Sequence, residues 1–238
     1  MLEMLGFSRD GWSGMMLLAA LTTLGLTFAA LLVGSVFGAW VAGAKLSRRR
    51  LWRFFGDGYS VIFRGIPELL IIYLFYFGGS GFLTVIGRFF GADGYIEVPA
   101  FLIGALAIGM ISGAYQGEVY RGAVMAVSPG ELEAAYAMGM TKACVLRRIL
   151  LPQVLRYSLP GLANVWQMSL KDSALVSVTG IVELMRASQV AAGSTRQYFT
   201  FYIIGGLCYL VLTGLSNPLI SSAEKRLGRS GKTPFASR

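Results

Sequence analysis

The chain has 238 residues and is 55% hydrophobic but only 14% charged. Soluble domains usually carry about 25% charged residues, so this composition excludes an ordinary water-exposed globule of the same length. The net charge of +9 is compatible with nucleic-acid binding. The basic residues, however, fall in blocks between apolar runs, which indicates loops beside a membrane and no nucleic-acid partner. The absence of histidine removes the commonest general base and metal ligand, and we expect no metal site.

Long runs without charge mark the elements that we predict along the chain. A helix that crosses a bilayer core of about 30 Å needs roughly 20 apolar residues. Charge is absent from the runs 11–44, 69–87, 98–117 and 197–223, and a further run, 157–182, is apolar except for two adjacent residues. We therefore predict an all-α, polytopic membrane protein with about five spans, at 15–43, 59–87, 98–120, 155–182 and 197–222.

The distribution of Lys and Arg predicts the orientation of these spans. Basic residues cluster after the first span, after the third and after the fifth. The other side has only Arg9, Arg88, Arg186 and Arg196. The positive-inside rule therefore places the N-terminal segment, 1–14, outside and the basic tail, 223–238, in the cytoplasm. An odd number of spans requires the same arrangement. The first span is too long for the apolar part of a cleaved signal peptide.

Two predicted spans carry small residues at intervals of four, which places them on one side of each helix. In lipid, such sides allow helix backbones to approach closely. We predict packing faces at both stripes, although glycine is also common in membrane helices in general. The two stripes are Gly34, Gly38 and Ala42, and Gly109, Gly113 and Gly117.

The loop 128–152, between the third and fourth spans, is the most informative stretch. Ser128 is expected to cap a short helix, with Glu131 completing a capping box. Gly139 then supplies a left-handed turn, and Thr141 can cap a second short helix. Both helices are too short to be stable alone, so they must pack on something.

Pro152 is expected to end the second short helix before the fourth span. From these residues alone, two interpretations of the loop stay open. It is either a compact knob offered to another protein or a connector that lies on its own bundle.

A family resemblance favours the knob. The spacing of the loop residues resembles the EAA motif of ABC-importer permeases: EAA, three residues, G, nine residues, I, one residue, LP. The residues that match are Glu133, Ala134, Ala135, Gly139, Ile149, Leu151 and Pro152. The segments RGIPELL (64–70), GEVYRGAVMAVSPGELEAA (117–135) and LKDSALVS (170–177) resemble permeases for polar amino acids, of the histidine/lysine/arginine and opine group. One departure is Pro129-Gly130-Glu131, where many relatives read PKGQ.

The resemblance implies a type I ABC-importer permease domain over 15–222 in a bacterial inner membrane, with a periplasmic N-terminus. It further implies a second, similar permease subunit and a periplasmic solute-binding protein. Two cytoplasmic ATPases would each receive one EAA loop and bind ATP and Mg²⁺, so that this chain binds no cofactor. The expected solute is a polar, cationic amino acid or an opine.

Ionisable residues within the predicted spans form the second candidate site. Charges at membrane depth are costly and mark solute paths or internal pairs, and both interpretations stay open here. Pro67 favours a break in the helix between Arg64 and Glu68, which would otherwise share a face. Lys171 and Asp172 are adjacent, so they cannot face the same partner.

Three further polar residues are weaker candidates. Asn164 lies on the fourth span and could join the solute path. Glu118 and Arg121 lie near the cytoplasmic end of the third span, where they form either a gate or an interfacial ion pair. The tail sequence GRSGKT lacks the glycine spacing of a phosphate-binding loop, so ATP must be hydrolysed by partner subunits and this chain is no enzyme. The alternative function is a self-contained secondary transporter or channel.

Overall fold

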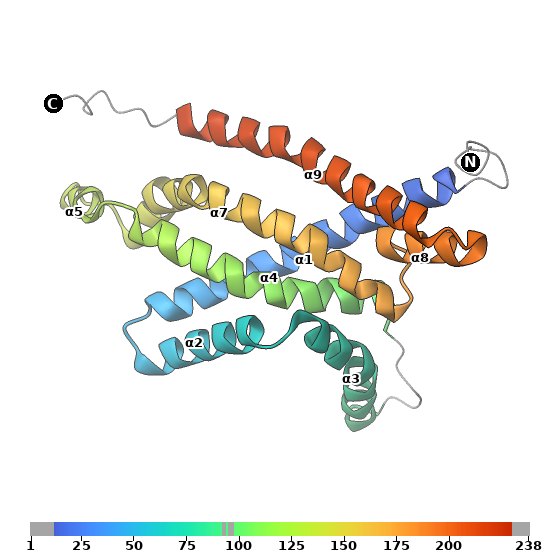
Figure 1. Cartoon of the computed structure of the whole chain (residues 1–238). Helices are drawn as coiled ribbons and strands as arrows, with labels where there is room; N and C mark the ends of the chain where they lie inside the picture. Colours follow the sequence, from blue (N-terminus) through green and yellow to red (C-terminus); the bar gives the residue numbers. More distant parts are fainter. Residues whose placement is uncertain (1–11, 92–93, 95–97, 230–238) are drawn as a thin grey trace.

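The computed structural model describes residues 12–91, 94 and 98–229, and every regular element among them is a helix (Figure 1). Most of the predicted N-terminal segment and of the predicted tail therefore lies outside the described residues. The helices are α1 Ser13–Leu46, α2 Arg50–Gly65, α3 Glu68–Phe89, α4 Ala100–Met125, α5 Pro129–Ala137, α6 Lys142–Val145, α7 Leu151–Asp172, α8 Leu184–Thr195 and α9 Tyr198–Arg229. The predicted all-α class is confirmed.

Four helices in the described part of the chain are long and apolar enough to cross a membrane. They cover Ser13–Leu46, Glu68–Phe89, Ala100–Met125 and Tyr198–Arg226. A fifth crossing results if the segments Lys142–Thr179 and Leu184–Thr195, which meet at 51°, count as one broken span. This count agrees with the predicted five.

The second predicted span, 59–87, is two helices rather than one. Ile66 is extended, with φ −92° and ψ 139°, and α3 begins again directly after Pro67. The cause is local, because proline has no N–H to donate and forces the residue before it out of the helical region. The carbonyl of Pro67 then accepts hydrogen bonds from the backbone N–H groups of Leu70 and Ile71, at 3.0 and 3.2 Å.

The fourth predicted span, 155–182, also differs from a single straight helix. A 3₁₀ turn, Ser173–Thr179, follows α7, and the chain then bends at Gly180, which has φ +89°. The bend is fixed by Glu183, whose fully buried carboxylate accepts hydrogen bonds from the N–H groups of Met185 and Arg186 at 2.8 and 2.7 Å. The hydroxyl of Tyr209 on α9 also donates to this carboxylate, at 2.7 Å. Glu183 thus caps α8 and ties it to α9.

The centre of the fold is the contact between α1 and α4, which lie side by side in Figure 1. The two predicted glycine stripes pack on each other here. A Cβ atom on Gly38 would stand 2.8 Å from the Cβ atom of Gln116, and one on Gly109 would stand 2.7 Å from that of Val33. The predicted packing faces are therefore confirmed, and each serves as the partner of the other.

Candidate functional site

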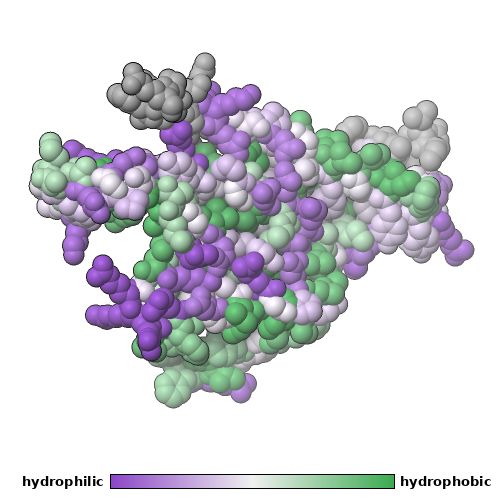
Figure 2. Space-filling view, turned by 60° about the vertical axis from the view of Figure 1, so that its left-hand side comes forward, coloured by the Kyte–Doolittle hydropathy of each residue, from purple (hydrophilic) through white to green (hydrophobic). Residues whose placement is uncertain are grey.

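The loop with the EAA spacing stands at one end of the bundle. In Figure 1, α5 lies at the opposite end from α8 and from the N-terminal end of α1. Figure 2 brings this end forward and shows that hydrophilic side chains gather on it. The loop is anchored to the bundle by an apolar cluster of Ala123, Val127 and Val154, against which Leu132 and Leu150 pack.

A glycine turn sets the angle between the two short helices, as predicted. Gly139 has φ +79°, a region that side chains with a Cβ atom disfavour. Its N–H donates to the carbonyl of Tyr136 at 2.9 Å, and the N–H of Met140 donates to the carbonyl of Ala135 at 3.1 Å. The predicted cap of the next helix is also present, because the N–H of Cys144 donates to the hydroxyl of Thr141 at 3.4 Å.

The predicted capping box of α5 is not formed. The hydroxyl of Ser128 receives no hydrogen bond from the first turn of the helix. The carboxylate of Glu131 instead accepts a hydrogen bond from Nε2 of Gln153 at the start of α7. Gln153 thus replaces the backbone of Ser128 as the expected partner of Glu131, and this hydrogen bond ties α5 to α7.

Pro152 does not end the second short helix. The chain stays helical from α6 through a π turn, Leu146–Leu150, into α7. The N–H of Leu151 donates to the carbonyl of Leu146, five residues back. This wider turn shifts the hydrogen-bond register just before Pro152, at a position where a residue without an N–H is tolerated. The loop is thereby continuous with α7, and a displacement of α6 must act on α7 directly.

A hollow of about 470 Å³ opens between α5 and the start of α7. Ala134 and Ala135 form part of its wall, and their small side chains leave the space open. Ala135 is buried, whereas Glu133, Ala134 and Gly139 are exposed. Most of the residues with the EAA spacing therefore face outward or line one depression. The lining residues are Glu131, Ala134, Ala135, Met138, Met140, Arg148, Ile149 and Gln153.

Glu118 and Arg121 are part of an ion network that joins three helices. Arg121 donates to Glu118 at 2.9 Å, and the ammonium group of Lys45 on α1 binds the other oxygen of Glu118. Lys45 also pairs with Asp57 on α2, at 3.3 Å. Sequence reasoning found Glu118 and Arg121 but missed Lys45 and Asp57, because Lys45 reads as one member of a basic block. The network fixes α1, α2 and α4 to one another near the loop.

Arg64 lies at the end of α2, just before the break at Pro67. Its guanidinium carbon is 5.2 Å from the ring centroid of Tyr115 on α4, a cation–π contact that could not be predicted from the sequence. Arg64 also lines a hollow of about 570 Å³ together with Lys45, Asp57, Ser60 and Tyr115. The hydroxyl oxygen of Ser60 is buried without a hydrogen-bond partner in the described part of the chain.

Glu68 and Asp172 come together from distant parts of the sequence. Glu68 is the first residue of α3 and Asp172 the last of α7, and their carboxyl groups lie within hydrogen-bonding reach of each other. Oδ2 of Asp172 is buried, and no described N–H or O–H group donates to it. In the described residues, the ion pairs all belong to the Lys45 network, so neither carboxyl group forms an ion pair. Lys171, the neighbour of Asp172 in the chain, acts on it only from a distance.

Lys171 faces the other side of α7, as its adjacency to Asp172 predicted. It lines a separate hollow of about 350 Å³ with Ser188 of α8 and Tyr202 of α9. Asn164 is exposed on α7 and does not join the acidic pair. On the same helix, Nε2 of Gln167 donates to Oδ1 of Asn217 on α9, at 2.9 Å. The predicted solute-path residues thus fall into separate groups.

A family model identifies the chain. Residues 34–229 match the binding-protein-dependent transport system inner membrane component, and this range contains α2 to α9 and the C-terminal part of α1. The chain belongs to this family. Its members work with ATPase subunits and a solute-binding protein, and the ATPases hydrolyse the ATP. The chain is therefore a non-catalytic permease subunit of the inner membrane.

Two similar proteins are permease proteins of transport systems. The chain is 49% identical to the octopine transport system permease protein OccQ of Rhizobium radiobacter, over 94% of either chain. It is 40% identical to the histidine/lysine/arginine/ornithine transport system permease protein HisQ of Escherichia coli, over 91% of this chain and 94% of that protein.

A solved structure confirms the fold. The crystal structure of an amino acid ABC transporter with histidines has a chain that is 33% identical, with a TM-score of 0.75. The match covers 90% of this chain and 95% of the other. The predictions of the family, of the permease fold and of the inner-membrane location are confirmed, whereas the orientation of the termini remains a prediction.

Proposed function

We propose that this permease is one of two homologous membrane subunits of an importer for a cationic amino acid or an opine. The second subunit is a different chain with the same fold, as the histidine and opine group suggests. Two ATPases bind ATP and Mg²⁺ on the cytoplasmic side, and a periplasmic protein delivers the solute. No cofactor binds to the permease itself.

The loop at the end of the bundle is the coupling element in this proposal, and its geometry is the observation that carries it. Its short helices are held at a fixed angle by the turn at Gly139, and the π turn makes the loop continuous with α7. A movement of the ATPases would therefore be transmitted to α7 and its bend. The coupling residues are Glu133, Ala134, Ala135, Gly139, Ile149, Leu151 and Pro152.

Reconstitution tests the coupling function against a self-contained transporter. The full complex in proteoliposomes should accumulate solute only with ATP, and the permease subunits alone should not transport down a solute, proton or sodium gradient. Uptake by the permease subunits alone would support the secondary transporter or channel. If the chain is a subunit of an ATP-driven importer, an ATPase should co-purify with it. A self-contained transporter would not bring an ATPase with it.

The acidic pair of Glu68 and Asp172 supports a cationic solute. An acidic pair without an ion-paired cation attracts an ammonium or guanidinium group, and the low dielectric of a membrane protein strengthens that attraction. Arg64, on the other side of the break at Pro67, is suited to the carboxylate of an amino acid. Lys171 and Asn164 lie apart from this pair and have a smaller part in the path.

Competition experiments test the solute class. Uptake of labelled arginine by the full complex should be reduced by excess lysine, histidine or octopine, and glutamate or leucine should have no effect. Titration of the same ligands into the isolated binding protein separates selection by the permease from selection by the binding protein. A system that prefers glutamate in both measurements would contradict the proposed solute.

The ion network at Glu118 and Arg121 has a gating role in this proposal. It joins α1, α2 and α4 next to the coupling loop, where relative movement of these helices would open or close the cytoplasmic end. A purely structural ion pair would leave transport rates unchanged when it is removed and would change only the stability of the complex.

A further inference from the structure

The helix α2 presents three different sides. Gly56 and Ser60 are buried against the bundle, and a Cβ atom on Gly56 would stand 2.9 Å from Cγ of Lys45. A second side carries Arg53, Asp57 and Arg64, since successive residues of a helix are about 100° apart. The third side is apolar and faces away from the bundle, and it has no partner among the described residues.

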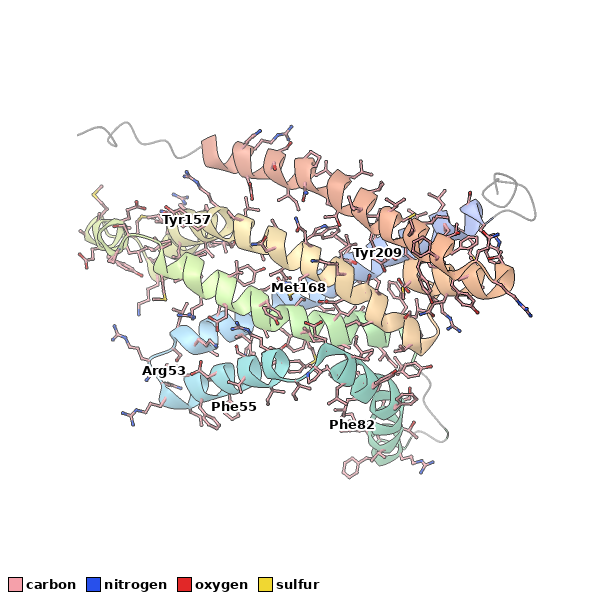
Figure 3. All side chains as sticks on the ribbon, in the orientation of Figure 1. Arg53, Phe55, Phe82, Tyr157, Met168 and Tyr209 are labelled. Carbon is pink, nitrogen blue, oxygen red and sulfur yellow. The ribbon has the colours of Figure 1, made fainter. Side chains whose placement is uncertain are left out.

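The apolar side of α2 is strongly exposed along the whole helix. Leu51 is 66% exposed and Phe55 52%, and farther along Ile62 is also 52% exposed. Phe54 and Val61, each 71% exposed, extend the same side. Figure 3 shows Phe55 on the outer side of α2, away from α1 and α4. An apolar strip of this size needs a partner when the protein is in its native setting.

Four exposed arginines gather where α1 turns into α2. Arg48, Arg49, Arg50 and Arg53 are all exposed, and none belongs to an ion pair between described residues. The nearby Lys45 differs, because it is only 10% exposed and is already bound to Asp57 and Glu118. Figure 2 shows hydrophilic side chains beside hydrophobic surface at this end of the molecule. The four arginines are thus a free positive patch next to the apolar strip.

The patch and the strip together have the dimensions of one phospholipid. The four arginines lie at the beginning of α2, and Arg64 at its other end stacks on Tyr115 of α4, whereas the apolar strip continues from Leu51 to Ile62. Eleven residues of helix cover about 17 Å, close to the thickness of one leaflet of a hydrocarbon core of about 30 Å. Charge at one end and an apolar strip of leaflet length match a negatively charged headgroup with its acyl chains. A water-soluble protein partner would meet the arginines but not the whole strip.

We propose that the turn between α1 and α2 binds an anionic phospholipid of the cytoplasmic leaflet. Arg49, Arg50 and Arg53 hold the phosphate, and the acyl chains lie along Phe54 and Val61, at the edge of the apolar side next to Arg50. Guanidinium groups suit this role because they donate paired hydrogen bonds to phosphate oxygens. The bound lipid anchors the beginning of α2 beside the Lys45 network.

The test measures lipid binding, which does not depend on the solute or on coupling. The detergent-solubilised full complex is titrated with short-chain phosphatidylglycerol and with short-chain phosphatidylcholine, and retained lipid is counted by native mass spectrometry. The wild type should prefer phosphatidylglycerol. The double variant Arg50→Gln with Arg53→Gln should lose affinity for it about fivefold per arginine, because each basic residue near an anionic surface contributes about 1 kcal/mol.

A matched control separates this site from a general effect of charge. The double variant Lys225→Gln with Arg226→Gln removes the same charge from the last turns of α9, where Glu224 precedes the two basic residues, and should bind phosphatidylglycerol like the wild type. Phe54→Ser changes no charge and should weaken binding of the lipid as well. Failure of this test would leave the proposed importer function intact, because no transport is measured.

Three outcomes would overturn the proposal. One is equal affinity of the wild type for the two lipids, a result that needs no variant to fold. Another is an equal loss in both double variants. The third is a loss of bound ATPase from Arg50→Gln with Arg53→Gln in membranes that still contain the permease, which would make the patch an ATPase contact.

Discussion

The carbonyl oxygen of Gly34 lies 3.2 Å from the place that a Cβ atom of Gly113 would occupy. In the opposite direction, a Cβ atom on Gly34 would stand 3.0 Å from the carbonyl oxygen of Gly109. α1 and α4 thus meet backbone to backbone. In lipid, helices gain little from apolar burial, so this close packing has to hold the two helices together.

Gly113→Leu should therefore destabilise the permease. A Cβ atom at this position would stand 2.9 Å from Cβ of Phe37, and overpacking of this kind costs about 1–3 kcal/mol. The expected result is a lower thermal midpoint of the solubilised complex and a lower yield. Gly122→Leu on the same helix is the control, because a Cβ atom there would meet nothing within 4 Å. Equal midpoints for both variants would show that α1 and α4 do not depend on the stripe.

The two glycine stripes show which parts of the fold could be predicted from the sequence. Spacing by four on two apolar runs was enough to predict packing faces, since the helix repeat places those residues on one side. It did not say that the two faces meet, because every small-residue face looks alike in one dimension. The break at Pro67 was foreseeable from its missing N–H, but the direction that α3 takes after it was not.

Local capping rules failed where a tertiary partner competed. Ser128 and Glu131 have the spacing of a capping box, yet Gln153 on a different helix takes the carboxylate. Pro152 looks like a helix end, yet the π turn before it lets the helix continue. In the same way, Glu68 and Asp172 are far apart in sequence, so only the fold could show that they meet. The adjacency of Lys171 and Asp172, by contrast, was enough to predict that they face different sides.

Gly139→Val should uncouple ATP hydrolysis from transport while the protein still inserts. Its φ of +79° would strain a β-branched residue by about 1–3 kcal/mol, so that α5 and α6 reorient. Solute-stimulated ATP hydrolysis and uptake by the complex should both fall. Gly130→Ala in α5 is the control, since a Cβ atom there is in ordinary contact, 3.7 Å from the hydroxyl of Ser128. Normal stimulation and uptake in Gly139→Val would rule out a stiff coupling turn.

The orientation of the spans can be tested by labelling. In a variant without Cys144 and Cys208, a cysteine in place of Ser194 should react with an impermeant thiol reagent in intact cells, and one in place of Arg50 should not. Both positions are exposed, so only the membrane decides the result. Positions 92 and 230 would extend the test but lie outside the described residues. Labelling at position 50 from outside would overturn the predicted topology.

Glu68→Gln separates a solute site from a structural pair. If Glu68 and Asp172 attract the cationic group of the solute, the variant should take up arginine with an affinity lower by about tenfold to a hundredfold, because hydrogen bonds to charged groups contribute about 1.5–3 kcal/mol. Basal ATP hydrolysis and assembly should stay normal, since Glu68 has no close cationic partner to leave unpaired. Asn164→Ala, on the exposed side of α7, is the control and should keep most of the uptake.

The structure makes this prediction sharper than the sequence did. If Glu68 were the partner of Arg64 or Lys171, its neutralisation would leave a buried cation and the complex would lose stability. Arg64 instead stacks on Tyr115, and Lys171 lines a different hollow, so stability should be preserved. A lower thermal midpoint with unchanged uptake would make the pair structural. Unchanged uptake together with unchanged stability would show that the solute does not meet Glu68 on its way through the membrane.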